Sequence, residues 1–428
     1  MELYYSFSVL IVLASFFAYL NLRFLKLPST IGVMIIAMLS SVLLVVTGHL
    51  VPQTFIRFSD LLQDVDFTEV LMGGMLNFLL FAGAIHINLN DLREQKMPVI
   101  TFSTLSVLIS TFLVGSLLYF CLPLAGWSVP YLYCLLFGAL ISPTDPIAVL
   151  GILKSARVPK ALETKVAGES LFNDGVAVVV FAVLLQLAEG AHVEMSATNI
   201  LWLLAKEAGG GFLLGALLGF GASNAIKKID DYKVTVLITL SVVMGGYLIA
   251  HAMHISGPLT MVAAGIVIGN YGQKHAMSST TKDYLNKFWE LIDDILNAIL
   301  FLFIGFELLL IPNLLDYWML GVISIVIVLF SRFFSIWFPT FLIPFKEKFS
   351  SGTIKILVWG GLRGGVSIAL ALSIDDGPYQ QLIISATYFV VVFSIVVQGM
   401  TIGKLANKVL PHEQTAPEKK KVLSPVQL

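Results

Sequence analysis

Long apolar segments alternate with short polar loops along almost the whole chain. A helix that crosses a membrane needs about 20 mostly apolar residues. Such runs lie near residues 4–22, 29–47, 68–87, 98–121, 131–153, 166–188, 199–224, 234–254, 257–271, 288–310, 315–342, 354–374 and 380–402. The pattern therefore predicts an all-α polytopic membrane protein with about thirteen transmembrane helices.

The charged residues in the loops predict which way the chain crosses the membrane. If the N-terminus is outside, nearly all of the 26 Lys and Arg residues fall in the inner loops and the C-terminal tail. Of the basic residues, only Arg57 falls in an outer loop, and the outer loops carry acids instead. Because cytoplasmic loops collect Lys and Arg, we expect a multi-pass protein of the cell membrane with its N-terminus outside and its C-terminus in the cytoplasm.

The amino-acid composition supports the prediction of a membrane protein and argues against several other classes of protein. Hydrophobic residues make up 57% of the 428 residues and charged residues only 12%, against about 25% charged residues in a soluble domain. Two cysteines cannot form a disulfide framework or a metal cage, and we expect no cofactor. The basic residues are spread thinly along one membrane face, which gives no support for nucleic-acid binding.

Two prolines interrupt the span 131–153, in the stretch Ser142-Pro-Thr144-Asp145-Pro. They remove backbone donors and bias the residue before each proline away from helical geometry. Broken backbone at this depth is tolerated only where it is buried in protein or lines a cavity. A simple proline kink would not explain an aspartate inside the break, so we expect a discontinuous helix at a functional site.

A second break is expected in the span 354–374, where four glycines surround an arginine in Gly360-Gly-Leu-Arg363-Gly-Gly. Glycine weakens a helix, although glycines alone would also suit close helix packing. A buried arginine makes packing alone a weaker explanation, because a charge inside the membrane usually has a function.

The two breaks occupy matching places in the chain. Each is the fifth span of a six-helix half. We expect repeat one near 4–188, a linker helix at 199–224 and repeat two near 234–402. These form a transmembrane domain over residues 1–403, which is followed by a short tail at 404–428. Six spans per half and one between them give the halves opposite polarity. Paired interrupted helices in inverted repeats point to a transporter's binding site. We expect them to cross at mid-membrane, where Asp145 and Arg363 would neutralise the half-helix ends; direct ion ligation by Asp145 is the less favoured alternative.

The span 166–188 carries the strongest candidate ligands, in Gly-Glu169-Ser170-Leu-Phe-Asn173-Asp174-Gly. Residues four apart share a helix face, so Ser170 lies with Asp174 and Glu169 with Asn173. A hard monovalent cation prefers oxygen ligands. We expect Asp174, Ser170, Asn173 and Thr144 to form the ion- and proton-binding group, the alternative being a polar network that only holds helices together.

Glu169 needs a cationic partner if it is buried. The best buried candidate is Arg332 in the span 315–342. We expect these two residues to form a structural ion pair that links two helices.

One carboxylate that binds either a proton or a cation is sufficient for exchange. Deprotonated Asp174 would attract the cation and protonation would release it, while alternating access moves the site across the membrane. Asn173 has no titratable proton, which favours electroneutral exchange of one cation for one proton.

Taken together, these motifs resemble the NhaP/NHE branch of the monovalent cation–proton antiporters. The resemblance rests on the three stretches above and on Phe288-Trp-Glu with Asn297 and Phe303-Ile-Gly, and it covers nearly the whole membrane region. It implies exchange of Na+ or Li+ for H+ by a homodimer of thirteen-helix protomers. It also implies that Asp174 carries ion and proton, that Thr144 and Ser170 coordinate the ion, and that Glu169 pairs with Arg332.

Several alternatives stay open. The chain departs from some relatives by having no acid in the stretch 78–86, and His86 there is either a pH sensor or an incidental interfacial histidine. The short tail fits a prokaryotic protein. K+/H+ exchange, Na+-coupled symport of an organic anion, and an intramembrane protease using Asp145 and Asp174 are the competing functions; we expect no enzyme, because Asp145 suits dipole compensation better than acid–base catalysis.

Overall fold

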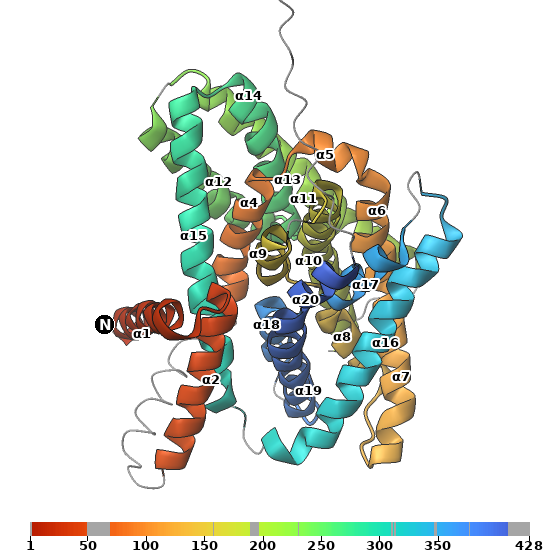
Figure 1. Ribbon diagram of the computed structural model, residues 1–428. Coiled ribbons are helices and arrows are strands. Elements are labelled where there is room, and N and C mark those ends of the chain that lie inside the picture. Colours follow the sequence, from red (N-terminus) through yellow and green to blue (C-terminus); the bar gives the residue numbers. More distant parts are fainter. Residues whose placement is uncertain are drawn as a thin grey trace, which may run out of the picture.

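The computed structural model describes residues 2–48, 69–156, 158–188, 197–229, 231–309, 311, 314–345, 349–375 and 377–409, and within these ranges all regular structure is helical (Figure 1). The predicted outer loop with Arg57 and most of the predicted tail lie outside the described residues.

The first half of the described chain contains a series of long helices and one interrupted helix. Its elements are α1 (Glu2–Leu20), η1 (Asn21–Leu25), α2 (Ser29–Gly48), η2 (Glu69–Met75), α4 (Leu76–Ile85), α5 (Leu89–Glu94), α6 (Lys96–Ile100), η3 (Thr101–Leu105), α7 (Ser106–Cys121), η4 (Leu122–Ala125), α8 (Tyr131–Ile141), α9 (Pro146–Ser155), α10 (Lys160–Ala188) and α11 (Ala197–Ile226).

The second half repeats this plan with another interrupted helix. Its elements are α12 (Tyr232–Ala252), α13 (Gly257–Val267), η5 (Ile268–Gly272), α14 (Gln273–His275), α15 (Ser279–Phe306), η6 (Glu307–Leu309), η7 (Leu314–Tyr317), α16 (Trp318–Leu342), α17 (Ser351–Trp359), α18 (Gly365–Leu372), α19 (Gln380–Phe393), η8 (Ser394–Gln398) and α20 (Gly399–Val409).

These helices confirm the predicted all-α membrane fold. Eight of the described helical stretches are long and apolar enough to cross a membrane. The other five predicted spans coincide with shorter, interrupted or more polar helices, namely η2 with α4, α8 with α9, α13 with η5, α15, and α17 with α18.

Helix ends differ from the predicted bounds where polar residues extend a helix beyond its apolar part. α15 begins at Ser279, nine residues before the predicted start at 288, because Ser278 caps it through a hydrogen bond from the Thr281 amide to its Oγ, at 3.3 Å. α20 continues to Val409, past the predicted end of the membrane domain at 403. Apolar runs locate the span in the bilayer and miss such extensions into the interface.

Close helix packing at glycine brings the interrupted helix α8 against α7. A Cβ atom on Gly138 would collide with the backbone carbonyl oxygen of Thr111. Small residues allow such approach between membrane helices, where van der Waals packing replaces the hydrophobic driving force. The packing fixes α8, the N-terminal half of the first broken helix, against the rest of the bundle.

The two interrupted helices meet where their chains are not helical. α8 ends at Ile141 and α9 begins at Pro146, while α17 ends at Trp359 and α18 begins at Gly365. The Asp145 amide donates a hydrogen bond to the Leu362 carbonyl oxygen at 2.7 Å, which joins the two breaks directly. The predicted crossing of discontinuous helices is therefore present, near the centre of Figure 1.

Candidate ion-binding site at the helix crossing

Arg363 lies at the buried C-terminal end of α8, where the last carbonyl groups of the helix have no helical partner. Its Nη1 donates to the carbonyl oxygens of Ser142 at 3.1 Å and Pro143 at 3.0 Å, and its backbone amide donates to Ser394 Oγ at 2.8 Å. The side chain is 1% exposed. Since a helix C-terminus carries a partial charge of about −0.5, a buried guanidinium here satisfies both the charge and the unpaired carbonyls of the broken helix.

Asp145 lies beside the N-terminal ends of two half-helices. It directly precedes Pro146, the first residue of α9, and a Cβ atom on Gly364 would fall 2.5 Å from its Oδ2. Gly364 is the residue before α18, so only glycine lets the backbone approach the carboxylate this closely. A negative charge is favourable at helix N-termini, and one half-buried aspartate serves both.

Thr144 is held in the first break by two residues of α10. Asn173 Nδ2 donates to Thr144 Oγ1 at 2.8 Å and Asn173 Oδ1 accepts from the Thr144 amide at 3.4 Å. Ser170 Oγ donates to the Thr144 carbonyl oxygen. The sequence prediction placed Thr144, Ser170 and Asn173 in one site, and the structure brings all three together.

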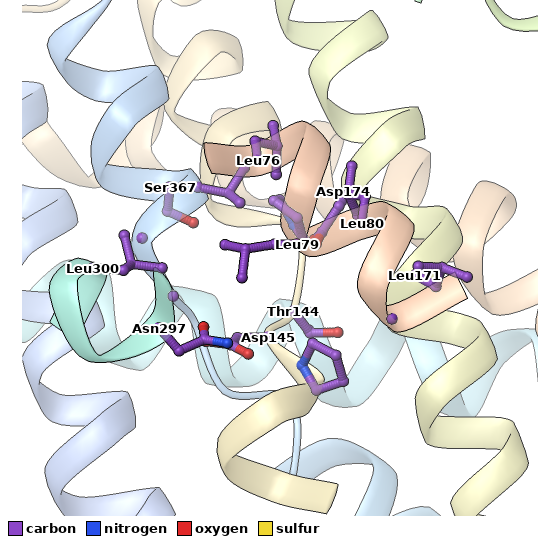
Figure 2. A pocket seen from close by; sticks show the side chains of 16 residues that line it. Leu76, Leu79, Leu80, Thr144, Asp145, Leu171, Asp174, Asn297, Leu300 and Ser367 are labelled. Carbon is purple, nitrogen blue, oxygen red and sulfur yellow. The ribbon is translucent and has the colours of Figure 1, made fainter. Parts of the chain in front are cut away.

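Asp174 and Thr144 line a cavity of about 80 Å³ at the crossing, together with Asp145 (Figure 2). Asp174 is 8% exposed and comes from α10, one turn beyond Ser170. Ser170 and Asn173 do not line this cavity and contact it only through Thr144. The volume accommodates a partly hydrated small cation, since a single water needs roughly 10–15 Å³ of such space.

Two further oxygen atoms line the cavity that the sequence had not assigned to the site. The side-chain oxygens of Asn297 on α15 and Ser367 on α18 are buried and have no hydrogen-bond partner among the described residues. Figure 2 shows both side chains around the same space as Thr144 and Asp145. Buried polar atoms normally have a hydrogen-bond partner, so these two oxygens are available to a bound ion or water molecule. Asn297 fell within a stretch that suggested the family and Ser367 lies two residues beyond one, but neither bears a charge that would have singled it out.

Glu169 and Arg332 form a buried ion pair on the far side of α10. Arg332 Nη2 lies 2.6 Å from Glu169 Oε1, with the side chains 7% and 2% exposed. Arg332 Nη2 also donates to the Leu357 carbonyl oxygen at 3.0 Å, in the last turn of α17. The pair therefore connects the helix that carries Asp174 to α17, the N-terminal half of the second broken helix. Arg332 compensates the carbonyl end of α17 as Arg363 compensates that of α8.

A wider vestibule adjoins the cavity. It has a volume of about 340 Å³ and includes His86, Asp91, Lys160 and Glu163, while Gly83 lines both spaces. Lys160 Nζ lies 2.7 Å from Asp91 Oδ2 at its rim, and the hydrogen bond that the Lys160 ammonium donates to Asp91 raises the pKa of this ammonium.

Crossed discontinuous helices around a buried carboxylate define a secondary transporter of small cations. The model of the family described as sodium/hydrogen exchanger, transmembrane, matches residues 11–408. The chain is 48% identical over 412 residues to the Na+/H+ antiporter NhaP of Pseudomonas aeruginosa, covering 94% of this chain and 96% of that one. It is 36% identical over 350 residues to the Na+/H+ antiporter NhaH of Halobacillus dabanensis, covering 81% and 84% of the two chains.

A solved structure shows the same fold. The sodium–proton antiporter MjNhaP1 of Methanocaldococcus jannaschii at pH 8 superposes with a TM-score of 0.76 at 20% identity, covering 96% of this chain and 99% of that chain. The chain therefore belongs to the sodium/hydrogen exchanger family, as an NhaP-type Na+/H+ antiporter. The family consists of transporters, and the resemblance inferred from the motifs is confirmed.

Proposed function

We propose that the protein exchanges one Na+ or Li+ for one H+ by alternating access, with Asp174 as the group that binds the two in turn. The observation that carries the proposal is the cavity at the crossing, where the Asp174 carboxylate shares a small space with the oxygens of Thr144, Asn297 and Ser367. A hard monovalent cation prefers such a set of oxygen ligands.

Electroneutral exchange is supported by the contacts of Asn173 and Asp145. Both amide atoms of Asn173 are bound to Thr144, so Asn173 acts by positioning that residue and carries no proton. Asp145 lies against the N-terminal ends of α9 and α18, where a permanent negative charge is favourable. Asp174 is then the one carboxylate whose charge changes during the cycle.

The remaining site residues have supporting roles in this proposal. Ser170 and Asn173 orient the Thr144 oxygens toward the ion through their hydrogen bonds to Thr144. Arg363 and Asp145 compensate the half-helix ends, while Glu169 and Arg332 hold the mobile core together. None of these supporting residues changes charge during the proposed cycle, in contrast to Asp174.

The cavity size argues against symport of an organic anion. Sites for organic ligands usually occupy about 300–1,000 Å³, whereas this cavity has about 80 Å³ and is lined by two carboxylates. No observation favours K+ over Na+, so a cation series is part of the test.

The test uses everted membrane vesicles with a pH-sensitive dye and additions of Na+, Li+ and K+. Asp174→Asn should abolish the cation-dependent pH change while expression and folding are retained. Asp294→Asn is the matched control, because it makes the same chemical change at an exposed position of α15 outside the cavity. Retained exchange in Asp174→Asn would contradict the assignment.

Competition and charge balance give a second, independent test. If one carboxylate binds either ion, the apparent KM for Na+ should rise by about tenfold per pH unit on acidification below the pKa of the site, with the maximal rate unchanged. In proteoliposomes, an imposed membrane potential should leave the rate unchanged if exchange is one-for-one. A rate that follows the potential would exclude the proposed stoichiometry.

Location, orientation and assembly stay predictions. We propose a cell-membrane protein with its N-terminus outside and its C-terminus in the cytoplasm, in keeping with the loop charges, and a homodimer as the family resemblance implies. Labelling of single cysteines at either end with an impermeant reagent tests the first, and mass measurement of the purified protein by light scattering tests the second.

A further inference from the structure

A second hollow, unrelated to the ion pathway, opens between α16, α17 and α20. Its volume is about 550 Å³ and its walls are almost entirely apolar, including Phe333 of α16, Trp359 of α17 and Leu405 of α20. We call this space the α17–α20 groove. A pocket of this size with apolar walls fits an acyl chain rather than an ion.

Three lysines stand at the groove. Lys355 comes from α17, and Lys404 and Lys408 lie four residues apart on one face of α20. All three side chains are exposed, and none forms an ion pair with another described residue. Three cations therefore gather beside an apolar hollow without any anion from the described part of the chain to balance them.

The apolar wall continues along α16 as an aromatic row. Phe333, Trp337 and Phe341 stack at centroid distances of 6.4 and 6.0 Å, and all three side chains are well exposed. On a helix that crosses a membrane such a row faces lipid. The groove is therefore continuous with the lipid-facing surface, and it also carries the positive charge of the three lysines.

We propose that the α17–α20 groove binds one anionic phospholipid, with its phosphate at Lys355, Lys404 and Lys408 and an acyl chain against Phe333, Trp359 and Leu405. Basic pockets between membrane helices are suited to anionic headgroups, and the long lysine side chains extend toward the membrane interface. The loop charges place these lysines on the cytoplasmic side, where anionic lipids are found.

The bound lipid would contact the second broken helix close to the crossing. Trp359 is the last residue of α17, and its indole donates to Thr401 Oγ1 at 2.8 Å, while its carbonyl oxygen accepts from Gln398 Nε2 at 3.1 Å. These bonds already connect α17 to the last helices of the chain. A lipid across the same junction would hold α17 and α20 together, so we expect it to raise thermal stability.

The test measures lipid binding and melting of the full-length protein purified in detergent. The probes are phosphatidylglycerol, phosphatidylcholine with the same acyl chains, and inorganic phosphate. We expect native mass spectrometry to show one tightly retained phosphatidylglycerol per protomer, a rise in melting temperature with this lipid, and no rise with the other two probes. If phosphatidylcholine raised the melting temperature as much as phosphatidylglycerol, the lysines would not recognise the headgroup and the proposal would be wrong. If inorganic phosphate raised it as much, the site would bind an anion and not a lipid, which would also contradict the proposal.

Variants separate the groove from general charge effects. The triple variant K355Q/K404Q/K408Q should lose phosphatidylglycerol affinity by on the order of 100-fold, given about a factor of five for each lysine. The control K227Q/K228Q/K282Q removes the same charge from exposed lysines of α15 and the turn after α11 and should bind normally. L405W keeps all three lysines and fills the groove, so it should weaken binding as well. Equal losses in both triple variants, or unchanged binding in L405W, would overturn the proposal.

Discussion

The buried pair Glu169–Arg332 allows a quantitative prediction, because its two partners make different additional contacts. Glu169 contacts Arg332 at 2.6 Å, whereas Arg332 also donates to the Leu357 carbonyl oxygen at 3.0 Å. Removing one partner of a buried pair costs about 3–5 kcal/mol, because the other charge stays buried without compensation. Glu169→Met should therefore destabilise the protein by about that amount.

Arg332→Met should be worse than Glu169→Met by about 1–3 kcal/mol, because it also leaves the Leu357 carbonyl oxygen without its donor. The double variant removes both charges and should cost only about 1–3 kcal/mol, which is the carbonyl term alone. The two single costs together then exceed the cost of the double variant by about 6–10 kcal/mol, which is the coupling in favour of the pair. An unfolding entropy of about 2.1 cal/mol/K per residue over 428 residues converts each kcal/mol into roughly 1 °C.

The assay is the melting temperature of the four proteins in one detergent, read by fluorescence-detected gel filtration after heating. The expected order is wild type, double variant, Glu169→Met and Arg332→Met, from most to least stable. The apparent KM for Na+ of the double variant should match wild type, since the pair does not line the cavity. A double variant as unstable as the two single effects added together would refute the reasoning.

Three other variants test separate parts of the structure. Gly138→Ala should lower the melting temperature by about 1–3 °C, because its methyl group collides with the α7 backbone; Gly151→Ala, which has open space around it, should not lower it. Asp145→Asn should lower melting temperature and transport rate while proton competition with Na+ persists, and loss of that competition would make Asp145 the carrier. Asp91→Asn should leave the transport profile between pH 6 and 9 unchanged, as a dye assay would show. Asp91 raises the pKa of Lys160 above its ordinary value of 10.5. The Lys160–Asp91 pair therefore contributes fully to stability below pH 10.5, and this contribution is lost only as the pH rises past the raised pKa, which is above the range of the assay.

Much of the fold was predictable because its signals are local. Thirteen apolar runs mark the membrane helices, and proline or glycine clusters mark the two places where the backbone cannot stay helical. The charged residues within spans then had few partners to choose from. Pairing Glu169 with Arg332 needed only the rule that a buried charge requires compensation, and the two side chains lie in contact.

The details of the site were less predictable. Helical spacing shows which residues share a face of a helix, but it does not show what that face contacts. Residues 170 and 174 share a face of α10, yet Ser170 is turned to the Thr144 carbonyl while Asp174 lines the cavity. Which of the two reaches the ion depends on how α10 is rotated against the broken helix. Asn297 and Ser367 are neutral, so the sequence gives no sign that their side-chain oxygens are buried without hydrogen-bond partners among the described residues.

The arrangement of fixed charges explains why one carboxylate can be free to titrate. The carbonyl ends of α8 and α17 each receive a buried arginine, Arg363 and Arg332, and Asp145 lies at the N-terminal ends of α9 and α18. If Asp145 took up a proton in each cycle, two half-helices would lose their compensating charge every time the site was emptied. Among the described residues, no half-helix end is hydrogen-bonded to Asp174, so in the proposed cycle its protonation would change the affinity of the cavity and leave the crossing intact. A transporter built on broken helices therefore needs its permanent and its exchanging charges on different residues, and the geometry at residues 145 and 174 provides that separation.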